Sequence, residues 1–324
     1  MAGVRQRVMN PPLVSILIPC CNAEKYVAAA LHSALGQTWP NKEIIVVDDG
    51  STDGSSQILG QFGQGIKIFR HEKRNAAATR NHAFQQSRGE FIKFFDADDL
   101  LEPRMVELQM NRLAGSLTAV ASAEWGRFYQ DDIATLRFNP QSVWRDMNPL
   151  DWLVESWIDT QPMTQPALFL IPRPVIEKSG LWDERLSLLD DFEFFARVLC
   201  HASEVRFTPG ARLYYRSGVS GSLSGQKSRK AAESEFQSLM TGTAHLLARR
   251  QDARARLACA NELQDFIYTY YPLYPDLRLR MEARISELGG SNQPPSGPPK
   301  FQRLRRLTGW KLARRVQQFA GAWK

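Results

Sequence analysis

Short apolar runs alternate with stretches of helical periodicity over roughly the first third of the chain. Apolar runs bounded by turn-forming residues predict buried strands, and they cover residues 13–18, 43–48, 66–69 and 90–95. Apolar side chains that recur every three or four positions predict helices between them, at residues 23–35, about 54–62, 76–86 and 103–113. We expect Pro19 to end the first strand and Asn22 to cap the first helix.

This alternation predicts the fold class. Apolar strands joined by helices are typical of an α/β fold with a mainly parallel, Rossmann-like sheet and helices on both faces. In such sheets ligands bind beyond the carboxyl ends of the strands. Candidate residues follow three of the predicted strands: Pro19 and Asn22, Asp48 and Asp49, and the run from Asp96 to Asp99. We therefore expect one site at this edge of the sheet.

The second half of the chain is less regular. We expect a strand at 167–171, a turn and short helix at 172–178, a helix at 192–199, and short strands at 205–207 and 211–215. Residues 217–225 are rich in glycine and serine, residues 228–288 are predicted to be helical with a break at Pro272 and Pro275, and four prolines make 291–299 a linker. The aromatic-rich region 116–165 has no clear period.

Residues 300–324 carry a pattern of their own. Apolar residues recur at three or four positions from Phe301 to Trp323, and lysine or arginine fills most of the remainder. A basic amphipathic helix of this kind suits the surface of an anionic membrane. A helix packed on the body of the protein or on a partner chain would show the same pattern, so both readings stay open.

The net charge of +7 belongs to this tail, because residues 300–324 hold eight cations and no acid. The rest of the chain is close to neutral, so we expect no nucleic acid as a partner. The four cysteines and five histidines have no metal-ligand spacing, which argues against zinc and for a reduced compartment. We find no signal peptide and no apolar run long enough to span a bilayer. We expect a cytoplasmic protein, peripheral at the inner face of the membrane if the tail docks there.

The run Asp96-Ala97-Asp98-Asp99 has the clearest chemistry. Three carboxylates within four positions repel one another, and burial at the end of a strand increases that repulsion. A divalent cation that also binds a phosphorylated ligand would relieve it, and Mg²⁺ and Mn²⁺ prefer such oxygen ligands. The alternative is a solvated acidic turn that caps the helix starting near Pro103.

Six short strings occur in a fixed order along this part of the chain, at residues 14–19, 34–38, 43–53, 78–81, 89–92 and 96–99. Together with Asn22 they resemble the family 2 glycosyltransferases. The resemblance is strong over residues 12–115 and weaker over 160–225. It implies the GT-A fold, a nucleotide-sugar donor bound at the strand ends, and an Asp-x-Asp motif that holds Mg²⁺ or Mn²⁺.

The resemblance also implies roles for single residues. Pro19 and Cys20 would line the pocket of the base, where Cys21 replaces the usual tyrosine. Asp49 would contact a uracil ring, and a carboxylate also suits a guanine edge. Arg80 would lie near the ribose or diphosphate, with an exposed ion pair as the alternative. The implied donor-binding residues are Pro19, Cys20, Asn22, Asp49, Arg80, Asp96, Asp98 and Arg216, and the implied metal ligands are Asp98 and Asp99.

The catalytic base of the family is a carboxylate that deprotonates the acceptor hydroxyl. The segment 180–184 precedes Asp190-Asp191 at the family's spacing, so the resemblance implies that Asp191 is this base. Asp190 replaces the usual glutamate, and a simple helix cap is the alternative role of the pair. The residues after Tyr215-Arg216 resemble a loop that closes over the donor diphosphate, without its usual histidine. A flexible connector is the alternative.

The implied function is a metal-dependent, inverting transfer of a sugar from a nucleotide diphosphate donor, with a UDP-sugar favoured, to a hydroxyl acceptor. The acceptor would be a glycan or a lipid-linked molecule of cell-envelope or polysaccharide synthesis. A transferase acting on polyprenyl phosphate and a non-catalytic nucleotide-sugar-binding scaffold are the alternatives. The expected domains are a GT-A domain at 1–225, with a donor half at 12–115 and an acceptor half at 116–225, a helical extension at 226–290, the linker 291–299 and the basic helix 300–324.

Overall fold

The computed structural model describes residues 11–72, 74–129, 131–160, 162–218 and 228–319. It divides into two compact units. Unit 1 comprises residues 1–146, 165–182 and 201–219, and unit 2 comprises 147–164, 183–200 and 220–324. The chain therefore passes between the units several times, and the domain division expected from the sequence stays a prediction.

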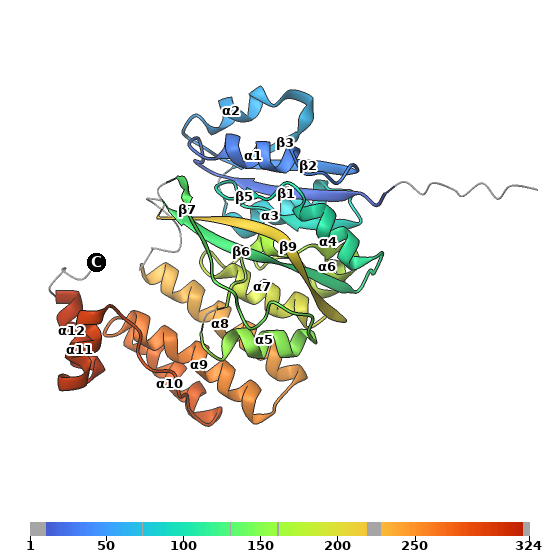
Figure 1. The fold of residues 1–324 in the computed structure, drawn as a ribbon. Coiled ribbons are helices and arrows are strands. Elements are labelled where there is room, and N and C mark those ends of the chain that lie inside the picture. The colour runs from blue at the N-terminus through green and yellow to red at the C-terminus, as the bar shows by residue number, and fades with distance from the viewer. Residues whose placement is uncertain (1–10, 73, 130, 161, 219–227, 320–324) are drawn as a thin grey trace, which may run out of the picture. The chain divides into compact units, whose positions relative to one another are not determined.

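Unit 1 is built on a five-stranded sheet of order β3-β2-β1-β4-β8, of which Figure 1 labels β1, β2 and β3. Its strands are β1 (Val14–Cys20), β2 (Lys42–Asp49), β3 (Lys67–His71), β4 (Phe91–Phe94) and β8 (Ile171–Pro172). The first four run parallel and β8 is antiparallel at the edge. The apolar side chains of β1 and β4 are buried, as expected of strands covered on both faces. The parallel α/β sheet predicted from the sequence is confirmed.

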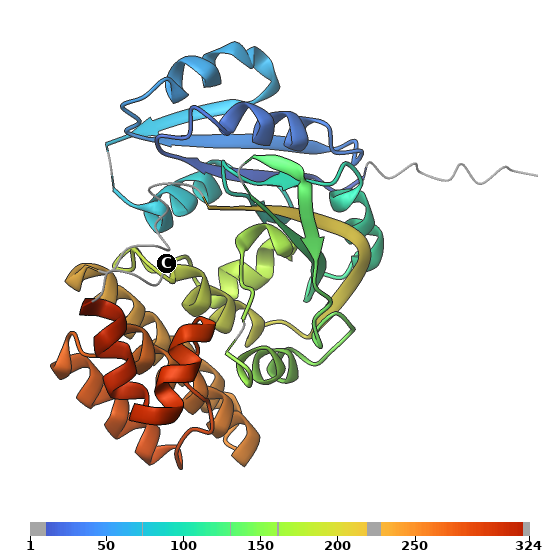
Figure 2. The same cartoon turned by 60° about the vertical axis from the view of Figure 1, so that its left-hand side comes forward.

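The helices of this sheet lie on both of its faces, as Figures 1 and 2 show. They are α1 (Val27–Leu35), α2 (Ser55–Gln61) and α3 (Ala76–Gln86), with the short 3₁₀ turn η1 (Gly63–Gly65) before β3. The strand order explains the placement. The chain moves outward from β1 to β2 and β3, and then returns past β1 to β4. Each crossover between parallel strands is right-handed, so a change in the direction of travel changes the face that the connecting helix covers. Helix α3 therefore lies on the face opposite α1 and α2. The reversal makes a switch point between β1 and β4.

Two predictions about the end of β1 were wrong. The strand continues through Pro19 to Cys20, although Pro19 was expected to end it. Beyond Leu17 the strand no longer pairs with β4, so the missing N–H of Pro19 removes no bond on that side. The first helix begins at Val27 and is not capped by Asn22, which instead adopts a left-handed backbone with a φ of 51°.

A second sheet of unit 1 has the order β5-β9-β6-β7. Its strands are β5 (Leu100–Leu101), β9 (Glu204–Ser217), β6 (Ala119–Tyr129) and β7 (Asp132–Phe138). The two short strands expected at 205–207 and 211–215 form the single strand β9, whose register against β6 shifts beside Gly210, where φ is +81°. Glycine tolerates that conformation, so Pro209-Gly210 makes a bulge and not a strand end.

The remaining elements of unit 1 are α4 (Met105–Leu113), which packs on β6 and β9, the 3₁₀ turn η2 (Pro166–Leu168) and α6 (Arg173–Ser179). The strand predicted at 167–171 was wrong in extent, because η2 takes its first half and β8 has only two residues. Pro166 supplies a fixed φ and no N–H, which suits the first turn of a helix better than a strand.

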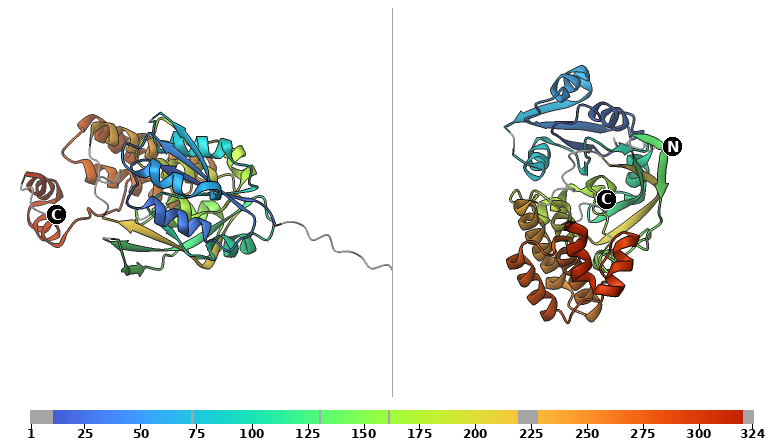
Figure 3. Two further views of the ribbon diagram at one scale, coloured as in Figure 1. Left: turned by 90° about the horizontal axis from the view of Figure 1, so that it is seen from above. Right: turned by 90° about the vertical axis from the view of Figure 1, so that its left-hand side faces the viewer.

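Unit 2 is helical, with α5 (Pro149–Trp157), α7 (Asp190–Leu199), α8 (Arg229–Arg249), α9 (Ala253–Tyr270) and α10 (Pro275–Glu287). Helix α8 packs against α7 and α9, and α10 packs against α9 (Figure 3). A Cβ on Gly242 would lie 2.7 Å from the Phe192 ring, so this glycine allows α8 to approach α7 closely. The helices predicted over 228–288 are confirmed, with an additional break at 250–252 where Asp252 caps α9.

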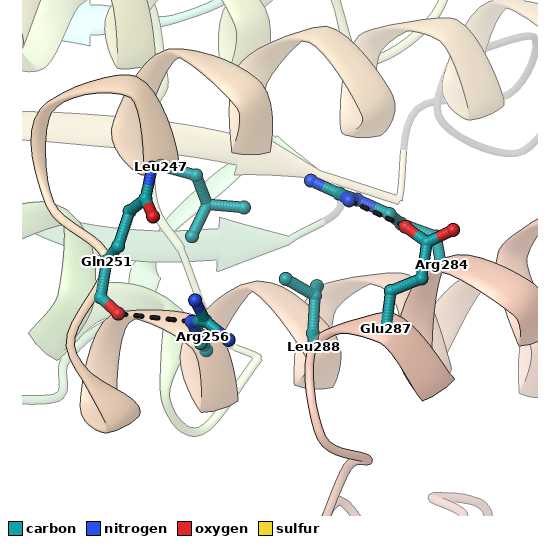
Figure 4. A pocket seen from close by; sticks show the side chains of 6 residues that line it. All are labelled: Leu247, Gln251, Arg256, Arg284, Glu287 and Leu288. Atoms are coloured by element: carbon teal, nitrogen blue, oxygen red, sulfur yellow. Dashed lines mark hydrogen bonds and ion pairs between the residues drawn. The ribbon is translucent and has the colours of Figure 1, made fainter.

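An open hollow in unit 2 is lined by Leu247, Gln251, Arg256, Arg284, Glu287 and Leu288 (Figure 4). Its cations are already bonded within the unit. Arg256 Nε donates to the Gln251 carbonyl at 3.1 Å, and Arg284 Nη1 lies 2.7 Å from Glu287 Oε2. We therefore assign no ligand to this hollow.

The basic tail forms two helices, α11 (Pro299–Thr308) and α12 (Trp310–Phe319), and not one. Gly309 separates them with a φ of +78°. The predicted single apolar stripe is divided, because Phe301 is fully buried while Leu312 and Val316 are exposed. Within the described residues, none of the helices combines the length and the apolar character that crossing a bilayer requires.

Candidate active site

Three strand ends of unit 1 meet at the switch point between β1 and β4. Pro19 and Cys20 end β1, Asp48 and Asp49 end β2, and the acidic loop Asp96–Asp99 follows β4. Because β1 pairs in parallel with both β2 and β4, these ends share one edge of the sheet. The edge of the sheet at which the sequence predicts a site therefore carries the polar residues that follow β1, β2 and β4.

Asp96 is held by two donors from different elements. Arg80 Nη2, on α3, donates to Asp96 Oδ1 at 2.9 Å, and Gln165 Nε2 approaches Asp96 Oδ2 at 3.3 Å. Arg80 is only 6% exposed, and its guanidinium lies 4.5 Å from the centre of the Trp182 ring. The Asp96 side chain keeps about a quarter of its surface exposed. An exposed surface ion pair does not describe Arg80, whose charge is buried and directed at the acidic loop.

Asp99 is fully enclosed, and both of its oxygens are engaged. Gln165 Nε2 donates to Asp99 Oδ2 at 2.6 Å, and the Arg216 main-chain N–H donates to Oδ1 at 2.8 Å. Burial, followed by the charges of Asp98 and Asp96, raises the pKa of Asp99 well above its usual range. These two bonds fix the loop against η2 and β9.

Asp98 differs from both neighbours. Its side chain is half-buried, and within the described part of the chain no other residue donates a hydrogen bond to its carboxylate. Burial, and then the charge of Asp96, raises the pKa of Asp98 to about 6, although Arg216 and Arg80 oppose this. The carboxylate is thus poorly compensated by the protein alone, which is the condition that a bound cation would relieve.

Arg216 is placed by β9 and packs on two aromatic rings. Its guanidinium carbon is 4.7 Å from the centre of the Tyr26 ring and 4.6 Å from that of Phe128. Its Nε donates to the Asp98 carbonyl at 2.6 Å, and its Nη1 is paired with Asp131. The rings fix the plane of the guanidinium beside the acidic loop.

A buried lysine lies behind the site. Lys93, on β4, is fully enclosed, and its Nζ donates to the carbonyls of Ala167 at 2.7 Å and Phe169 at 3.3 Å. Burial lowers the pKa of Lys93 to about 7. The Ala167 N–H donates in turn to Gln165 Oε1 at 2.6 Å. Lys93 and Gln165 therefore both bond to the η2 segment. Because Gln165 also donates to Asp96 and Asp99, it links the position of this segment to that of the acidic loop.

The end of β2 is organised by its own hydrogen bonds. Asp48 accepts from the Ser51 N–H at 3.0 Å and from the Ser56 hydroxyl. Burial alone would raise the pKa of Asp48, but the bonds from Ser51 and Ser56 hold it below its usual value. Asp49 Oδ1 accepts from the Arg74 N–H at 2.8 Å and is 5% exposed. Both carboxylates thus orient the loops around the strand end.

The end of β1 contributes main chain more than side chain. Cys20 is 1% exposed, and burial raises the pKa of its thiol to about 12, so it is an inert core residue. Pro19 is half-buried. Asn22 connects two loops: its Oδ1 accepts from the Thr52 N–H at 2.8 Å, and its own N–H donates to Ser51 Oγ at 3.0 Å. Asn22 therefore joins the loops after β1 and β2.

Asp191 belongs to unit 2, in the first turn of α7. Its Oδ2 accepts from Thr164 Oγ1 at 3.1 Å, and its Oδ1 accepts from the Phe192 N–H at 2.9 Å. An acid in the first turn of a helix is favoured by the helix dipole. The alternative in which the pair caps a helix that begins at Phe192 was wrong, because α7 begins at Asp190 and its N-cap is Leu189.

The structure brings together Arg80, Asp96, Asp98, Asp99 and Arg216, which the sequence had picked out from three separate segments. Four further participants were missed: Gln165, Tyr26, Phe128 and Lys93. None belongs to a short recognisable string, and only the alternation of Lys93 with apolar neighbours marked it as a charge within a buried strand. The predicted lid at 217–225 lies almost entirely outside the described residues.

Within the described residues, no group of three or more histidine, cysteine, aspartate or glutamate side chains is arranged to hold a metal ion. The acidic loop offers two carboxylates with accessible surface, Asp96 and Asp98, because Asp99 is only 1% exposed. Two carboxylates suit an Mg²⁺ or Mn²⁺ ion that takes its remaining ligands from phosphates and water. The residues present therefore fit a metal that arrives with a phosphorylated ligand.

Comparison with known proteins places residues 15–174 in the family described as "Glycosyl transferase family 2". EpsH of Bacillus subtilis, named as a glycosyltransferase, is 35% identical over 141 residues, which cover 43% of this chain and 41% of EpsH. TuaG of the same organism, named for teichuronic acid biosynthesis, is 32% identical over 141 residues, covering 42% of this chain and 56% of TuaG. The chain spans about half the length of these curated relatives.

Solved structures of Staphylococcus aureus TarS, residues 1–349, match nearly the whole chain. The complex with UDP-GlcNAc has a TM-score of 0.69 at 16% identity and covers 95% of this chain and 92% of that one. The complex with UDP has a TM-score of 0.65 at the same identity. This likeness establishes the fold, and it confirms the GT-A architecture with a C-terminal helical region that the sequence predicted.

Proposed function

We propose, from the premise that residues 15–174 form a family 2 glycosyl transferase domain, that this protein moves a sugar from a nucleotide diphosphate donor to a hydroxyl acceptor with inversion. The observation that carries the proposal is the acidic loop, where Asp96 and Asp98 lie beside the buried cations Arg80 and Arg216. A departing nucleoside diphosphate carries negative charge, and positioned cations stabilise such charge in the transition state.

The proposed donor is a UDP-sugar. TarS, whose fold this chain shares, is known in complexes with UDP and UDP-GlcNAc. The donor would lie along the edge formed by β1, β2 and β4, with Asp49 at the base and Arg80 and Arg216 at the ribose and diphosphate. The residues proposed to bind it are those expected from the sequence: Pro19, Cys20, Asn22, Asp49, Arg80, Asp96, Asp98 and Arg216. Cys20 would contribute through its main chain, because its side chain is in the core.

The proposed cofactor is Mg²⁺ or Mn²⁺, which when bound would neutralise charge on the leaving diphosphate. Asp98 keeps the ligand role expected from the sequence, and Asp96 is the second accessible carboxylate. For Asp99 we propose a different contribution: with its oxygens bonded to Gln165 and to the Arg216 N–H, it fixes the loop that presents Asp98.

The proposed catalytic base is Asp191. Bonds from Thr164 Oγ1 and from the Phe192 N–H orient its carboxylate. In the reaction, the acceptor oxygen would form a bond to the anomeric carbon while the bond to the diphosphate breaks on the opposite face. The acceptor proton would pass to Asp191. The acceptor would be a glycan or lipid-linked hydroxyl of cell-envelope synthesis, by analogy with TuaG, whose name refers to teichuronic acid.

Thermal shift with a panel of nucleotide sugars, each with and without Mn²⁺, tests the donor and the metal together. A ligand that binds only the folded state stabilises it by RT ln(1 + [L]/Kd), about 2.7 kcal/mol at a hundredfold excess over Kd. UDP-sugars should give the largest shift, and Asp98→Asn should remove the part that depends on Mn²⁺.

Glu282→Gln is the matched control, because Glu282 is an exposed carboxylate on α10 of unit 2. It should leave the Mn²⁺-dependent shift unchanged. Equal shifts for Asp98→Asn and the unaltered protein would contradict the metal assignment. Metal-dependent binding of a donor without transfer or hydrolysis would favour the scaffold reading over the enzyme.

A further inference from the structure

The C-terminal helices present an outer face that the packing of unit 2 leaves uncovered. Helices α11 and α12 lie side by side (Figure 2). Their inner residues are attached to the helical body: Phe301 is fully buried, Ala313 is 1% exposed, and the Trp310 ring lies 4.8 Å from that of Tyr268 and 5.0 Å from that of Tyr271. The pair is thus an ordered part of unit 2.

The outer face combines exposed apolar and exposed cationic side chains. Leu307 is 85% exposed, Leu312 50% and Val316 39%. On α12, Lys311 and Arg315 lie one turn apart next to Leu312 and Val316, and all four are exposed. On α11, Arg303 and Arg306 are exposed around Leu307. We define the outer face as Arg303, Arg306, Leu307, Lys311, Leu312, Arg315 and Val316.

The charge of this segment has one sign. Residues 299–319 contain seven cations and no acid. Arg314 is engaged internally, since its Nη2 donates to the Ser296 carbonyl at 2.9 Å and its guanidinium lies over the Phe301 ring.

Two cations of the outer face contact aromatic rings of the unit: Lys311 Nζ lies 5.8 Å from the centre of the Trp310 ring, and the Arg315 guanidinium carbon lies 5.6 Å from that of Tyr271. These rings leave the positive charge of the face uncompensated, because the segment contains no acid.

We propose that this outer face docks on an anionic lipid surface, with Leu307, Leu312 and Val316 in the acyl boundary and the cations at the headgroups. Large apolar side chains interleaved with cations match an interface that is apolar below and anionic above. A nucleic acid would complement the charge but not the leucines. Docking rests on the outer face alone and is independent of sugar transfer, although it would bring a lipid-linked acceptor to the proposed enzyme.

Vesicle sedimentation of the full chain tests the proposal. Vesicles of phosphatidylcholine and phosphatidylglycerol in equal parts should bind the protein, pure phosphatidylcholine vesicles should bind it weakly, and added salt should reduce binding. Each cation near an anionic surface contributes roughly fivefold in affinity. The triple variant Arg306→Gln/Lys311→Gln/Arg315→Gln should therefore bind on the order of a hundredfold more weakly.

A matched charge control removes three exposed cations elsewhere: Arg88→Gln/Lys178→Gln/Lys230→Gln. This control variant should bind the anionic vesicles almost as tightly as the unaltered protein, with only the small loss that a lower net charge causes. Equal losses in the two triple variants would overturn the proposal, because binding would then report overall charge.

The apolar half of the face has its own variant, Leu307→Ser/Leu312→Ser/Val316→Ser, which should lose at least tenfold in vesicle affinity. Leu117→Ser/Ile133→Ser is its control, since both side chains are about half exposed in unit 1. Because all these side chains are exposed, the unfolding midpoint should change little in any variant.

Two results would assign the face to another occupant and overturn the lipid proposal. One is tighter binding to duplex RNA than to anionic vesicles, lost in the charge variant. The other is a concentration-dependent oligomer in solution that the apolar variant dissociates. Donor binding measured by thermal shift on the same variants reports separately on the proposed enzyme.

Discussion

Two carboxyl groups, Asp99 in unit 1 and Glu262 in unit 2, are buried to nearly the same degree and lie in opposite surroundings. Burial raises the pKa of each well above its usual range. Asp99 receives hydrogen bonds from Gln165 and the Arg216 N–H. Glu262 has acidic neighbours, Asp265 and Glu235, which raise its pKa further. Within the described residues, its Oε1 accepts no hydrogen bond.

The contrast teaches that a strongly shifted pKa does not identify a functional carboxylate by itself. In unit 1 the protein supplies donors and cations around the acids, so the loop is fixed and its charge can serve a ligand. In unit 2 Glu262 is surrounded by helical core and acids, and the neutral form is its stable state. Geometry around the group, and not burial, separates a candidate site from a buried polar residue.

The sharpest test of this contrast compares Asp98→Asn with Glu262→Gln. Asp98→Asn should lower kcat by about 10²–10³-fold, because it removes a proposed ligand of the metal ion that would neutralise the leaving diphosphate. Glu262→Gln should leave kcat within about twofold, since a neutral acid and an amide are alike in charge and shape. Steady-state kinetics with the best donor measures both. A comparable loss of kcat in Glu262→Gln would show that Glu262 contributes to catalysis and would contradict the contrast.

A second test uses Lys93, the buried lysine behind the site. Its pKa in the folded state is about 7, below the 10.5 of an unperturbed lysine, so above pH 7 the unfolded chain binds more protons. The contribution of Lys93 to the free energy of unfolding should therefore rise between pH 7 and 10.5, by several kcal/mol at most. Urea unfolding at pH 6 and pH 9 should show this rise, and Lys93→Met should lose it. An identical pH dependence in both proteins would show that Lys93 is charged in the fold.

A third test separates positioning from packing. Gln165→Ala removes the donor to Asp99 and should lower kcat about tenfold, because an unsatisfied buried acid costs about 1–3 kcal/mol and releases the loop. Gln109→Ala is the matched control: its amide also holds the η2 segment, through the Leu168 carbonyl at 2.9 Å, without touching an acid. It should reduce stability similarly and change kcat little. An equal loss of kcat in Gln165→Ala and Gln109→Ala would show that Gln165 contributes through packing and does not position the acidic loop.

The smallest expected effect concerns the stability of unit 2. The pKa of Glu262 is higher in the folded than in the unfolded state, so the folded protein binds more protons above pH 4.5. Its contribution to stability is complete below that pH and declines as pH rises. Glu262→Gln, which cannot ionise, should raise the free energy of unfolding at pH 8 by about 1 kcal/mol and not at pH 4. An equal change in the free energy of unfolding at pH 4 and pH 8 would show that the substitution acts through packing and not through ionisation.

The sequence was sufficient where local pattern decides structure. The apolar runs of β1, β2 and β4 need no distant partner to be recognised, and α3 was predicted at its observed bounds. The acidic loop was found because like charges crowded after a buried strand are unusual. Arg80 and Arg216 were reached only through the family resemblance, and the structure brings both to that loop.

The rest depends on contacts between distant segments. Gln165 lies 66 residues from Asp99 in sequence, in a stretch with no clear period. The rings of Tyr26 and Phe128 can be recognised as part of the site only when β9 brings the Arg216 guanidinium against both of them. Pro19 was misjudged because whether a proline ends a strand depends on which neighbour its N–H would have faced. The tail was misjudged because Gly309 permits a turn that a continuous period does not reveal.

The repeated passage of the chain between its two units limits how the protein can be divided. Each unit draws its residues from three stretches of sequence, so no single cut yields an intact half. A fragment ending after β8 would lack β9 and with it Arg216, and one starting at α8 would lack α5 and α7. Engineers who wish to exchange the helices of unit 2 with those of a relative would have to transplant three separate segments at once. Recombination in nature faces the same obstacle, which favours change by point substitution over exchange of modules.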